Sequence, residues 1–333
     1  MIKIHSTYSD INQEQWNDLV LKSDTASFFQ TPACFSFYNS LSFLKPFVYG
    51  VSEENTLKAV ICGYIISDGN SLKRYFSRRA IIPGGVLVDN EISTGTLQQF
   101  LKYVTKQLSK ESIYIEIRNY NDYSTLQNGF DLSGFTYQPH LNFHLDTSSL
   151  DIINKRLKPN KKRYIKVSQK EDAFWFETKN ENEIKDFYVI LRELYESKVK
   201  TPLFPLEFFL RLANYDWGKI FVIKYLGNVV GGAAFVILPN KTIYEWFVCG
   251  EDRKYKNVYP SILSTWAGIE YASKNNLSSF DFMGAGKPNI HYGVRDFKAE
   301  FGGELVEHGR YLYVCKPLLY NLGKKVIQIL KKK

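Results

Sequence analysis

The hydrophobic pattern runs through the same order of elements twice along the chain. Each half has helical patterns, two strand-like apolar runs separated by a polar turn, a third strand, an amphipathic helix and further strands. In the first half these elements are predicted at residues 10–21, 47–51, 59–66, 80–88, 96–108, 113–117 and 135–145. In the second half they are predicted at residues 183–197, 205–213, 220–225, 229–238, 243–249, 259–274, 279–282 and 304–314.

This repetition predicts two copies of one mixed α/β unit rather than a single sheet. The segment between the copies, LDIINKRLKPNKKRYIKVSQKED, is strongly basic and helical in pattern, with an interruption at Pro159. We place the boundary near Leu150, which gives a first domain of residues 1–150 and a second of residues 151–333. A short linker predicts domains packed face to face around a cleft, which is a frequent location of ligand sites.

The composition excludes a disordered chain and a membrane-spanning one. Of the 333 residues, 44% are hydrophobic, including 24 Phe and 23 Tyr, and this apolar area is enough to build large cores. No segment approaches the roughly 20 uninterrupted apolar residues of a transmembrane helix, and the amino terminus lacks the apolar core of a signal peptide. We therefore expect a cytoplasmic protein. The four scattered cysteines are expected to be reduced, buried thiols.

The net charge of +9 favours polyanionic partners. Nucleic acid, a diphosphate-linked precursor and an anionic membrane surface all fit this charge, and so does an ordinary solvated basic surface. Much of the excess lies at residues 155–170 and 324–333. The tail at residues 318–333 alternates apolar residues with lysines, which predicts either a plain surface helix or a peripheral contact with an anionic membrane.

The stretch FDFMGAGKPNIHYGVRDFKAEFGG, which begins at Phe280, carries the most specific motif. It reads as a strand, an Asp, a glycine pair, a variable loop, then Phe-Lys and Phe-Gly. Supporting segments are SFFQTPACFSFYNS, IEIRN, LNFHLD and TPLFPLEFF. Together they resemble the Fem-type (FemABX) aminoacyltransferases over nearly the whole chain.

The resemblance implies two tandem acyl-CoA N-acyltransferase-like domains of the GCN5-type (GNAT) fold. It also implies an enzyme that transfers an aminoacyl group from aminoacyl-tRNA to an amine on a peptidoglycan or other cell-envelope precursor, without a cofactor. Lys298 matches the family's motif lysine, and Phe297 matches the adjacent aromatic residue that meets the donor's terminal nucleotide.

Acyl transfer to an amine passes through a tetrahedral species, so a positive group must stabilise an oxyanion. Lys298, just beyond the glycine loop, is the candidate for this role, and the alternative is an ordinary solvated lysine. Asp281 is predicted either to accept a proton or only to cap the loop. Gly284 and Gly286 permit positive φ and a close approach of backbone to the donor.

Further candidates are the basic and aromatic residues near these elements. Lys161, Lys162 and Arg163 are predicted to contact donor phosphates, although a solvated helix face explains them equally well. For the acceptor we expect bidentate recognition of a diphosphate or carboxylate. The acceptor candidates are Arg78, Arg79, Arg118, Tyr292 and Arg295. The histidines have no metal-ligand spacing, so no metal site is predicted.

Coenzyme A is the less favoured donor, because the strand-to-helix turn GEDRKYKNVYP has Gly250 but none of the further glycines of a pyrophosphate cradle. The positions at which the family has a lysine, an arginine and a tyrosine fall near Ser36, Phe204 and Val248. Two alternatives therefore stay open. One is an acyl-CoA-dependent N-acyltransferase of an envelope sugar or lipid, and the other is a catalytically degenerate relative that binds RNA or a precursor.

Overall fold

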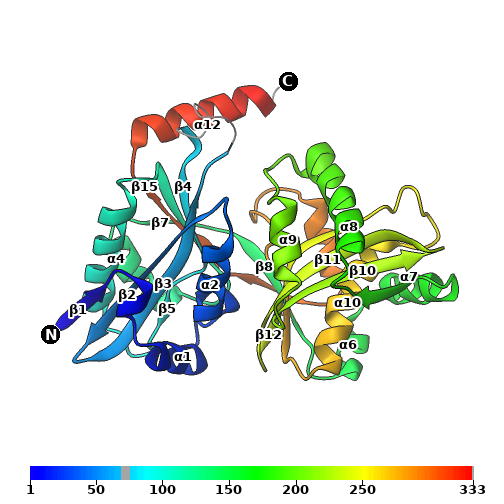
Figure 1. Ribbon diagram of the computed structural model, residues 1–333, viewed down its shortest axis with the longest axis horizontal. Helices are drawn as coiled ribbons and strands as arrows, with labels where there is room; N and C mark the ends of the chain where they lie inside the picture. The colour runs from blue at the N-terminus through cyan, green and yellow to red at the C-terminus, as the bar shows by residue number, and fades with distance from the viewer. Residues whose placement is uncertain (69–75, 332–333) are drawn as a thin grey trace. The chain divides into compact units, whose positions relative to one another are not determined.

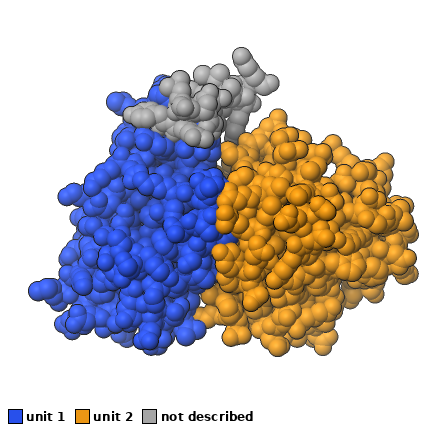
Figure 2. Space-filling view, in the orientation of Figure 1, with its two compact units in different colours: residues 1–140, 307–333 blue, residues 141–306 orange. Residues whose placement is uncertain are grey.

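The computed structural model describes residues 1–68 and 76–331, which form two compact units (Figures 1 and 2). Unit 1 comprises Met1–His140 and Glu307–Lys333, and unit 2 comprises Leu141–Val306. Each unit has its own sheet and its own buried core. The prediction of two mixed α/β units is confirmed.

The described residues of unit 1 form an eight-stranded sheet in the order β1-β2-β3-β4-β6-β15-β7, with β5 paired to β3. Its strands are β1 (Ile2–His5), β2 (Lys45–Glu53), β3 (Thr56–Ile66), β4 (Arg79–Gly84), β5 (Leu87–Val88), β6 (Tyr114–Asn119), β7 (Thr136–Gln138) and β15 (Arg310–Val314). The strand-like segment expected at residues 80–88 is divided into β4 and β5 at its turn signal, where Gly84 and Gly85 adopt φ of 81° and 87°.

The helices of unit 1 are α1 (Gln13–Lys22), α2 (Pro32–Ser40), α4 (Thr94–Leu108), α5 (Gln127–Asp131) and α12 (Pro317–Lys331). Helix α4 begins where the Ser93 hydroxyl accepts from the backbone N–H of Thr96. It then buries an apolar face that includes Phe100 and Leu101 in the same core as Ile115 and Ile117 of β6. Of the basic tail, residues 332–333 lie outside the described residues.

Unit 2 has a seven-stranded sheet in the order β14-β8-β13-β12-β11-β10-β9. Its strands are β8 (Leu141–Asp146), β9 (Phe174–Glu177), β10 (Gly218–Tyr225), β11 (Asn228–Leu238), β12 (Thr242–Gly250), β13 (Ser279–Asp281) and β14 (Glu304–Glu307). Strands β10 and β11 pair from Tyr225↔Asn228 onward. The hairpin turn is therefore Leu226-Gly227, both with positive φ, one residue earlier than expected.

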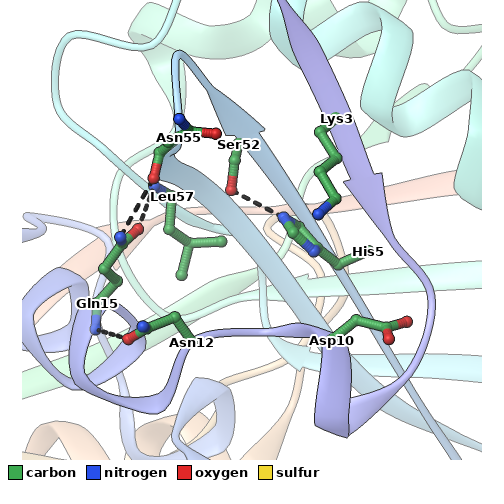
Figure 3. A pocket seen from close by; sticks show the side chains of 8 residues that line it. All are labelled: Lys3, His5, Asp10, Asn12, Gln15, Ser52, Asn55 and Leu57. Carbon is green, nitrogen blue, oxygen red and sulfur yellow. Dashed lines mark hydrogen bonds between the residues drawn. The ribbon is translucent and has the colours of Figure 1, made fainter.

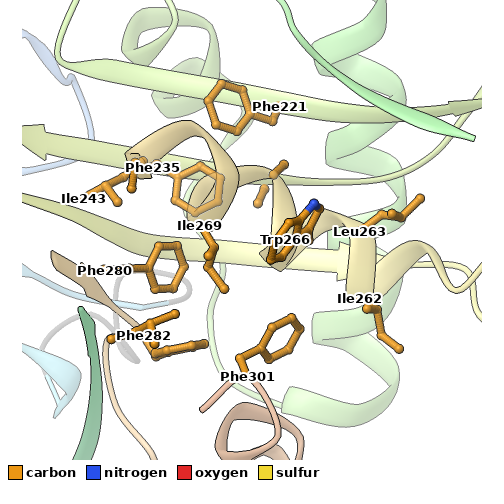
Figure 4. Close-up of a cluster of buried hydrophobic side chains, with 14 of the residues drawn as sticks. Phe221, Phe235, Ile243, Ile262, Leu263, Trp266, Ile269, Phe280, Phe282 and Phe301 are labelled. Atoms are coloured by element: carbon orange, nitrogen blue, oxygen red, sulfur yellow. The ribbon is translucent and has the colours of Figure 1, made fainter. Parts of the chain in front are cut away.

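The helices of unit 2 are α6 (Leu150–Arg156), α7 (Pro159–Lys170), α8 (Glu181–Leu194), α9 (Leu206–Leu212), α10 (Pro260–Lys274) and α11 (Gly293–Ala299). Helix α10 is buried along most of its length and packs against β10, β11, β12 and β13. Figure 4 shows the resulting core, in which Trp266 and Ile269 of α10 lie among Phe235 and Phe280 of the sheet.

The two halves exchange a strand. Strand β8 follows the first half in sequence but pairs with β13 of unit 2, whereas β15 near the end of the chain pairs with β6 and β7 of unit 1. The compact units therefore differ from the sequence domains of residues 1–150 and 151–333. The hydrophobic pattern along a strand does not specify which strand it will pair with, so the exchange has no signal in the sequence.

Three of the cysteines, Cys34, Cys62 and Cys249, are free and buried as expected, whereas Cys315 is free but partly exposed. None of the helices found within residues 1–68 and 76–331 is long and apolar enough to cross a bilayer.

Gly268 allows α10 to approach the sheet. A Cβ at this position would lie 2.4 Å from the ring of Phe235 and 2.7 Å from that of Phe280. Replacing a helical Gly by Ala normally gains about 1 kcal/mol, but overpacking a core costs about 1–3 kcal/mol. We expect Gly268→Ala to lower the free energy of unfolding by up to about 2 kcal/mol in denaturant titration. Gly323→Ala in α12 is the control, because a Cβ at this position would have no atom within 4 Å. This substitution should not lower the free energy of unfolding.

Candidate active site

The parallel strands β12 and β13 stop pairing part-way along β12. They pair from Thr242↔Ser279 to Tyr244↔Asp281, after which β13 ends and β12 continues to Gly250. Beyond Tyr244, β12 therefore has no ladder partner on this side among the residues that the structure describes. The corresponding strands of unit 1, β4 and β6, stay paired over six positions up to Gly84↔Asn119. Of the two parallel pairs in the described part of the chain, that of unit 2 diverges and that of unit 1 does not.

A buried ion pair lies at this divergence. The ammonium of Lys298, on α11, lies 4.0 Å from Oε2 of Glu245, the first residue of β12 beyond the paired segment. The side chains of Lys298 and Glu245 are only 9% and 1% exposed. The ammonium also donates to the carbonyl oxygens of Phe282, at 2.5 Å, and Gly284, at 2.9 Å. An ammonium has three donors, so one remains beyond these two hydrogen bonds.

Burial moves both pKa values of the pair toward neutrality. It lowers the pKa of Lys298 from its ordinary value, and the carboxylates of Glu245 and Asp281 only partly offset the effect. It raises the pKa of Glu245 to about 7, against the opposing influence of Lys298. The nearby Thr265 side chain also lowers the pKa of Glu245. A buried carboxyl that titrates near pH 7 beside a cation is an arrangement suited to proton transfer.

Glu245 was not predicted from the sequence. The available signal was a single carboxylate inside the apolar strand TIYEWFVCG, because a charge in such a place must be paired or have a shifted pKa.

Asp281 holds the loop that follows β13. Its Oδ1 accepts from the Asn142 side chain at 2.7 Å and from the backbone of Met283 at 2.6 Å. Its Oδ2 lies 3.2 Å from Nε2 of His144. Burial opposes the charge on His144, but Asp281 raises the pKa of that imidazole above its ordinary value. These contacts are those of the capping alternative, and a catalytic role for Asp281 stays a prediction.

The glycine loop adopts the backbone that the motif predicts. Gly284 and Gly286 have φ of 106° and 77°, a region that favours glycine. Arg295 donates to the carbonyl oxygens of Ala285, Lys287 and Pro288. Arg295, predicted to contact the acceptor, therefore uses its guanidinium to hold the loop. Tyr292 is exposed, with its ring against Gly286.

Phe297 and Lys161, both predicted to contact the donor, are in contact with each other. The Lys161 ammonium lies 3.9 Å from the centre of the Phe297 ring and 3.1 Å from Oε2 of Glu300. Its side chain is only 5% exposed, which places the ammonium inside unit 2 rather than on a phosphate-binding surface. One face of the Phe297 ring is covered by this contact, and the ring also packs against Phe301 in a T-shaped arrangement.

Lys162 and Arg163 are exposed on α7, beside the beginning of α10. Two contacts fix this placement. Tyr164 stacks on Tyr259 at 4.1 Å, and the Ser168 hydroxyl donates to the carbonyl of Val258. The exposed cations of α7 therefore lie next to the N-terminal end of the central helix of unit 2.

The predicted arginines of the first half belong to unit 1 and are not part of the Lys298 cluster. Arg79 forms a two-pronged ion pair with Asp68, and Arg118 binds Glu116. Arg78 lies directly before β4, and its carbonyl accepts from the backbone of Ile113.

A small polar cavity of about 200 Å³ also lies in unit 1, beside β1 and the β2–β3 turn (Figure 3). His5 and Ser52 form a hydrogen bond of 2.8 Å there, and Gln15 reaches across to the backbone of Asn55 and Leu57. None of the predicted site residues lines it. Within the described part of the chain, no group of three or more His, Cys, Asp or Glu side chains is placed to hold a metal ion.

Comparison with known families supports the choice of unit 2. Residues 221–332 match the model of the FemAB family. This segment is therefore similar to the FemAB family. It contains Glu245, the glycine loop and Lys298, so the resemblance predicted from the motif at Phe280 is confirmed. No curated protein matches the chain in sequence.

Solved structures extend the likeness of fold beyond the FemAB segment. The crystal structure of FemX is 12% identical and has a TM-score of 0.71, with 96% of this chain and 99% of that chain covered. A tandem GNAT protein from the clavulanic acid biosynthesis pathway is 11% identical, with a TM-score of 0.60 and coverage of 95% and 99%. The C-terminal domain of a protein named as a lysylphosphatidylglycerol synthetase, from Agrobacterium fabrum, is 13% identical, with a TM-score of 0.56 and coverage of 94% and 95%. The chain thus has the tandem GNAT fold.

Proposed function

We propose that the chain is an aminoacyltransferase that moves an acyl group from aminoacyl-tRNA to an amine of a peptidoglycan or related cell-envelope precursor. The observation that carries this proposal is the buried Lys298–Glu245 pair at the point where β12 and β13 diverge, inside the FemAB segment. The names of two structures with this fold, FemX and a lysylphosphatidylglycerol synthetase, fit the same broad chemistry of the cell envelope.

The pair supplies the two functions that aminolysis of an ester requires. The acceptor nitrogen attacks the ester carbonyl carbon, the new N–C bond forms, and the carbonyl electron pair moves to oxygen. The ammonium of Lys298 stabilises that oxyanion. Glu245, ionised above pH 7, takes the proton that the attacking nitrogen loses. The electron pair of the oxyanion then re-forms the carbonyl, the C–O ester bond breaks, and the proton passes to the departing tRNA oxygen, which leaves as a hydroxyl group.

The N-terminal end of α10 favours tRNA over coenzyme A as the donor. In GNAT folds this helix terminus is suited to bind the pyrophosphate of coenzyme A through free backbone N–H groups. Here the Asp252 carboxylate accepts from both the backbone N–H and the hydroxyl of Ser261. A carboxylate in this position occupies one donor and repels a second anion. The exposed Lys162 and Arg163 nearby are suited to the phosphates of a tRNA acceptor arm.

The donor assignment predicts a clear difference between two radiolabelled substrates. We expect single-turnover transfer to an amine acceptor from aminoacyl-tRNA and none from acyl-CoA, and we expect coenzyme A to leave the unfolding temperature unchanged. The Lys162→Gln/Arg163→Gln double variant should raise KM for aminoacyl-tRNA about tenfold with little change in kcat, because phosphate contacts add binding without chemistry.

Three results would change this assignment. Transfer from acyl-CoA with thermal protection would favour the coenzyme A alternative. Salt-sensitive tRNA binding without turnover on any donor would favour the catalytically degenerate alternative. An unchanged KM in the double variant, beside a normal wild type, would remove α7 from the donor site.

A further inference from the structure

Two arginines lie directly opposite each other on neighbouring strands of unit 1. Arg118 of β6 and Arg310 of β15 are Cα partners in the antiparallel ladder, so their side chains share one face of the sheet. Like charges in such a pair destabilise a sheet. Between them lies one carboxylate, Glu116, which accepts from Arg118 through Oε2 at 2.9 Å and from Arg310 through Oε1 at 2.6 Å.

One carboxylate does not neutralise two guanidinium groups. Burial opposes ionisation of Glu116, yet Arg118 and Arg310 hold its pKa at about 2, so it is charged at neutral pH. Burial and the repulsion from Arg118 lower the pKa of Arg310, whereas Glu116 raises the pKa of Arg118 despite its burial. The cluster therefore keeps one excess positive charge in a half-buried position.

The related position in unit 2 shows that the fold does not require this repulsion. There β8 takes the place that β15 has in unit 1, and the Cα partners on β13 and β8 are Asp281 and His144. These two side chains attract each other at 3.2 Å. The unfavourable pair in unit 1 is thus a property of its side chains and not of the strand exchange.

Both guanidinium groups are held in place and retain unused donors. Among the described residues Arg118 donates only to Oε2 of Glu116, from Nε and Nη2, so its Nη1 has no protein partner. Arg310 is oriented by Glu116 and by His140, whose Nε2 lies 3.0 Å from its Nη2. The Arg118 and Arg310 side chains are 33% and 30% exposed, which leaves them accessible to a small solute.

We infer that Arg118 and Arg310 form a binding site for an oxyanion, either a phosphate or a carboxylate group. Two guanidinium groups that face one side of a sheet present donors from two directions, and each such charge-assisted bond is stronger than a neutral one. The anion supplies the negative charge that Glu116 alone lacks. Both arginines belong to unit 1, and the proposal is tested by anion binding, independently of acyl transfer.

The test is isothermal titration of the full-length protein with inorganic phosphate, pyrophosphate and acetate, against chloride at constant ionic strength. We expect saturable binding that is at least about tenfold weaker in Arg118→Gln and in Arg310→Gln, and tighter in Glu116→Gln, which removes the competing carboxylate. Preference for phosphate or pyrophosphate over acetate identifies a phosphoryl ligand, and the reverse identifies a carboxylate.

A matched control and a stability measurement keep the result specific. Arg211→Gln removes an arginine that is likewise paired to a glutamate, Glu207, but lies on α9 of unit 2, and it should bind as the wild type does. Arg118→Gln should keep or raise the unfolding temperature, because it removes a like-charge contact and leaves Glu116 paired with Arg310. Absence of saturable binding to all three anions, or equal affinities in Arg118→Gln, Arg310→Gln and the control, would overturn the proposal.

Discussion

Lys298→Met is expected to lower the single-turnover rate of acyl transfer by roughly 10²–10³-fold, the usual effect of removing one oxyanion-stabilising donor. The ammonium is the buried cation at the divergence of β12 and β13, and it is held there by the carbonyl oxygens of Phe282 and Gly284. Methionine keeps the length of the side chain but provides no charge. The rate should fall at saturating donor, since the lost interaction forms chiefly in the transition state.

The same substitution also leaves Glu245 without its counter-ion and two carbonyl groups without their donor, so stability must be measured beside the rate. Lys219→Met is the control, because Lys219 is another mostly buried lysine of unit 2 and pairs with Glu177 at 2.8 Å on the edge of the sheet. It should lose stability but keep its transfer rate. A Lys298→Met protein that is folded and transfers at the wild-type rate would exclude the proposed role of the ammonium.

Much of the fold is predictable from the sequence because each half repeats its hydrophobic periodicities. The buried face of α4 and the apolar runs of β10 and β11 follow directly from spacings of 3.6 and 2 residues. The exchange of β8 and β15 is not predictable in this way. A strand with one buried face fits either sheet, and the choice depends on contacts between residues more than a hundred positions apart.

The same distinction applies to the candidate site, where residues close together in sequence are predictable and residues joined by sheet pairing are not. Lys298 and the glycine loop are local in sequence, so a short motif identifies them. Glu245 and Asn142 are distant from that motif and join it only through sheet pairing. Lys161 contacts Phe297 and Glu300, and Arg295 holds the loop at residues 285–288. The positive charge of Lys161 and Arg295 predicted contacts with a ligand. In the structure both side chains contact groups within unit 2.

Glu245→Gln is expected to lower kcat/KM by about 10²–10⁴-fold and to remove its dependence on pH between about 5.5 and 8. In the wild type the carboxyl has a pKa of about 7 because burial disfavours its charge. Below that pH it is protonated and accepts no proton, so activity should rise as pH increases through 7. Glutamine is never ionised, so the variant should have a low and level profile over the same range. Rates of acyl transfer measured across this range with saturating acceptor test the prediction.

His144 is another titratable group near the site, and Asp281 raises the pKa of its imidazole above the ordinary value. Like Glu245, His144 loses its proton as pH rises. The contributions of the two groups to the pH profile must therefore be distinguished by substitution. If Glu245 is the base, His144→Gln retains the rise near pH 7 and Glu245→Gln loses it. The opposite result would assign the proton transfer to the imidazole. A rise that persists in both variants would reflect ionisation of the acceptor amine itself, and Glu245 would then have no part in accepting the proton.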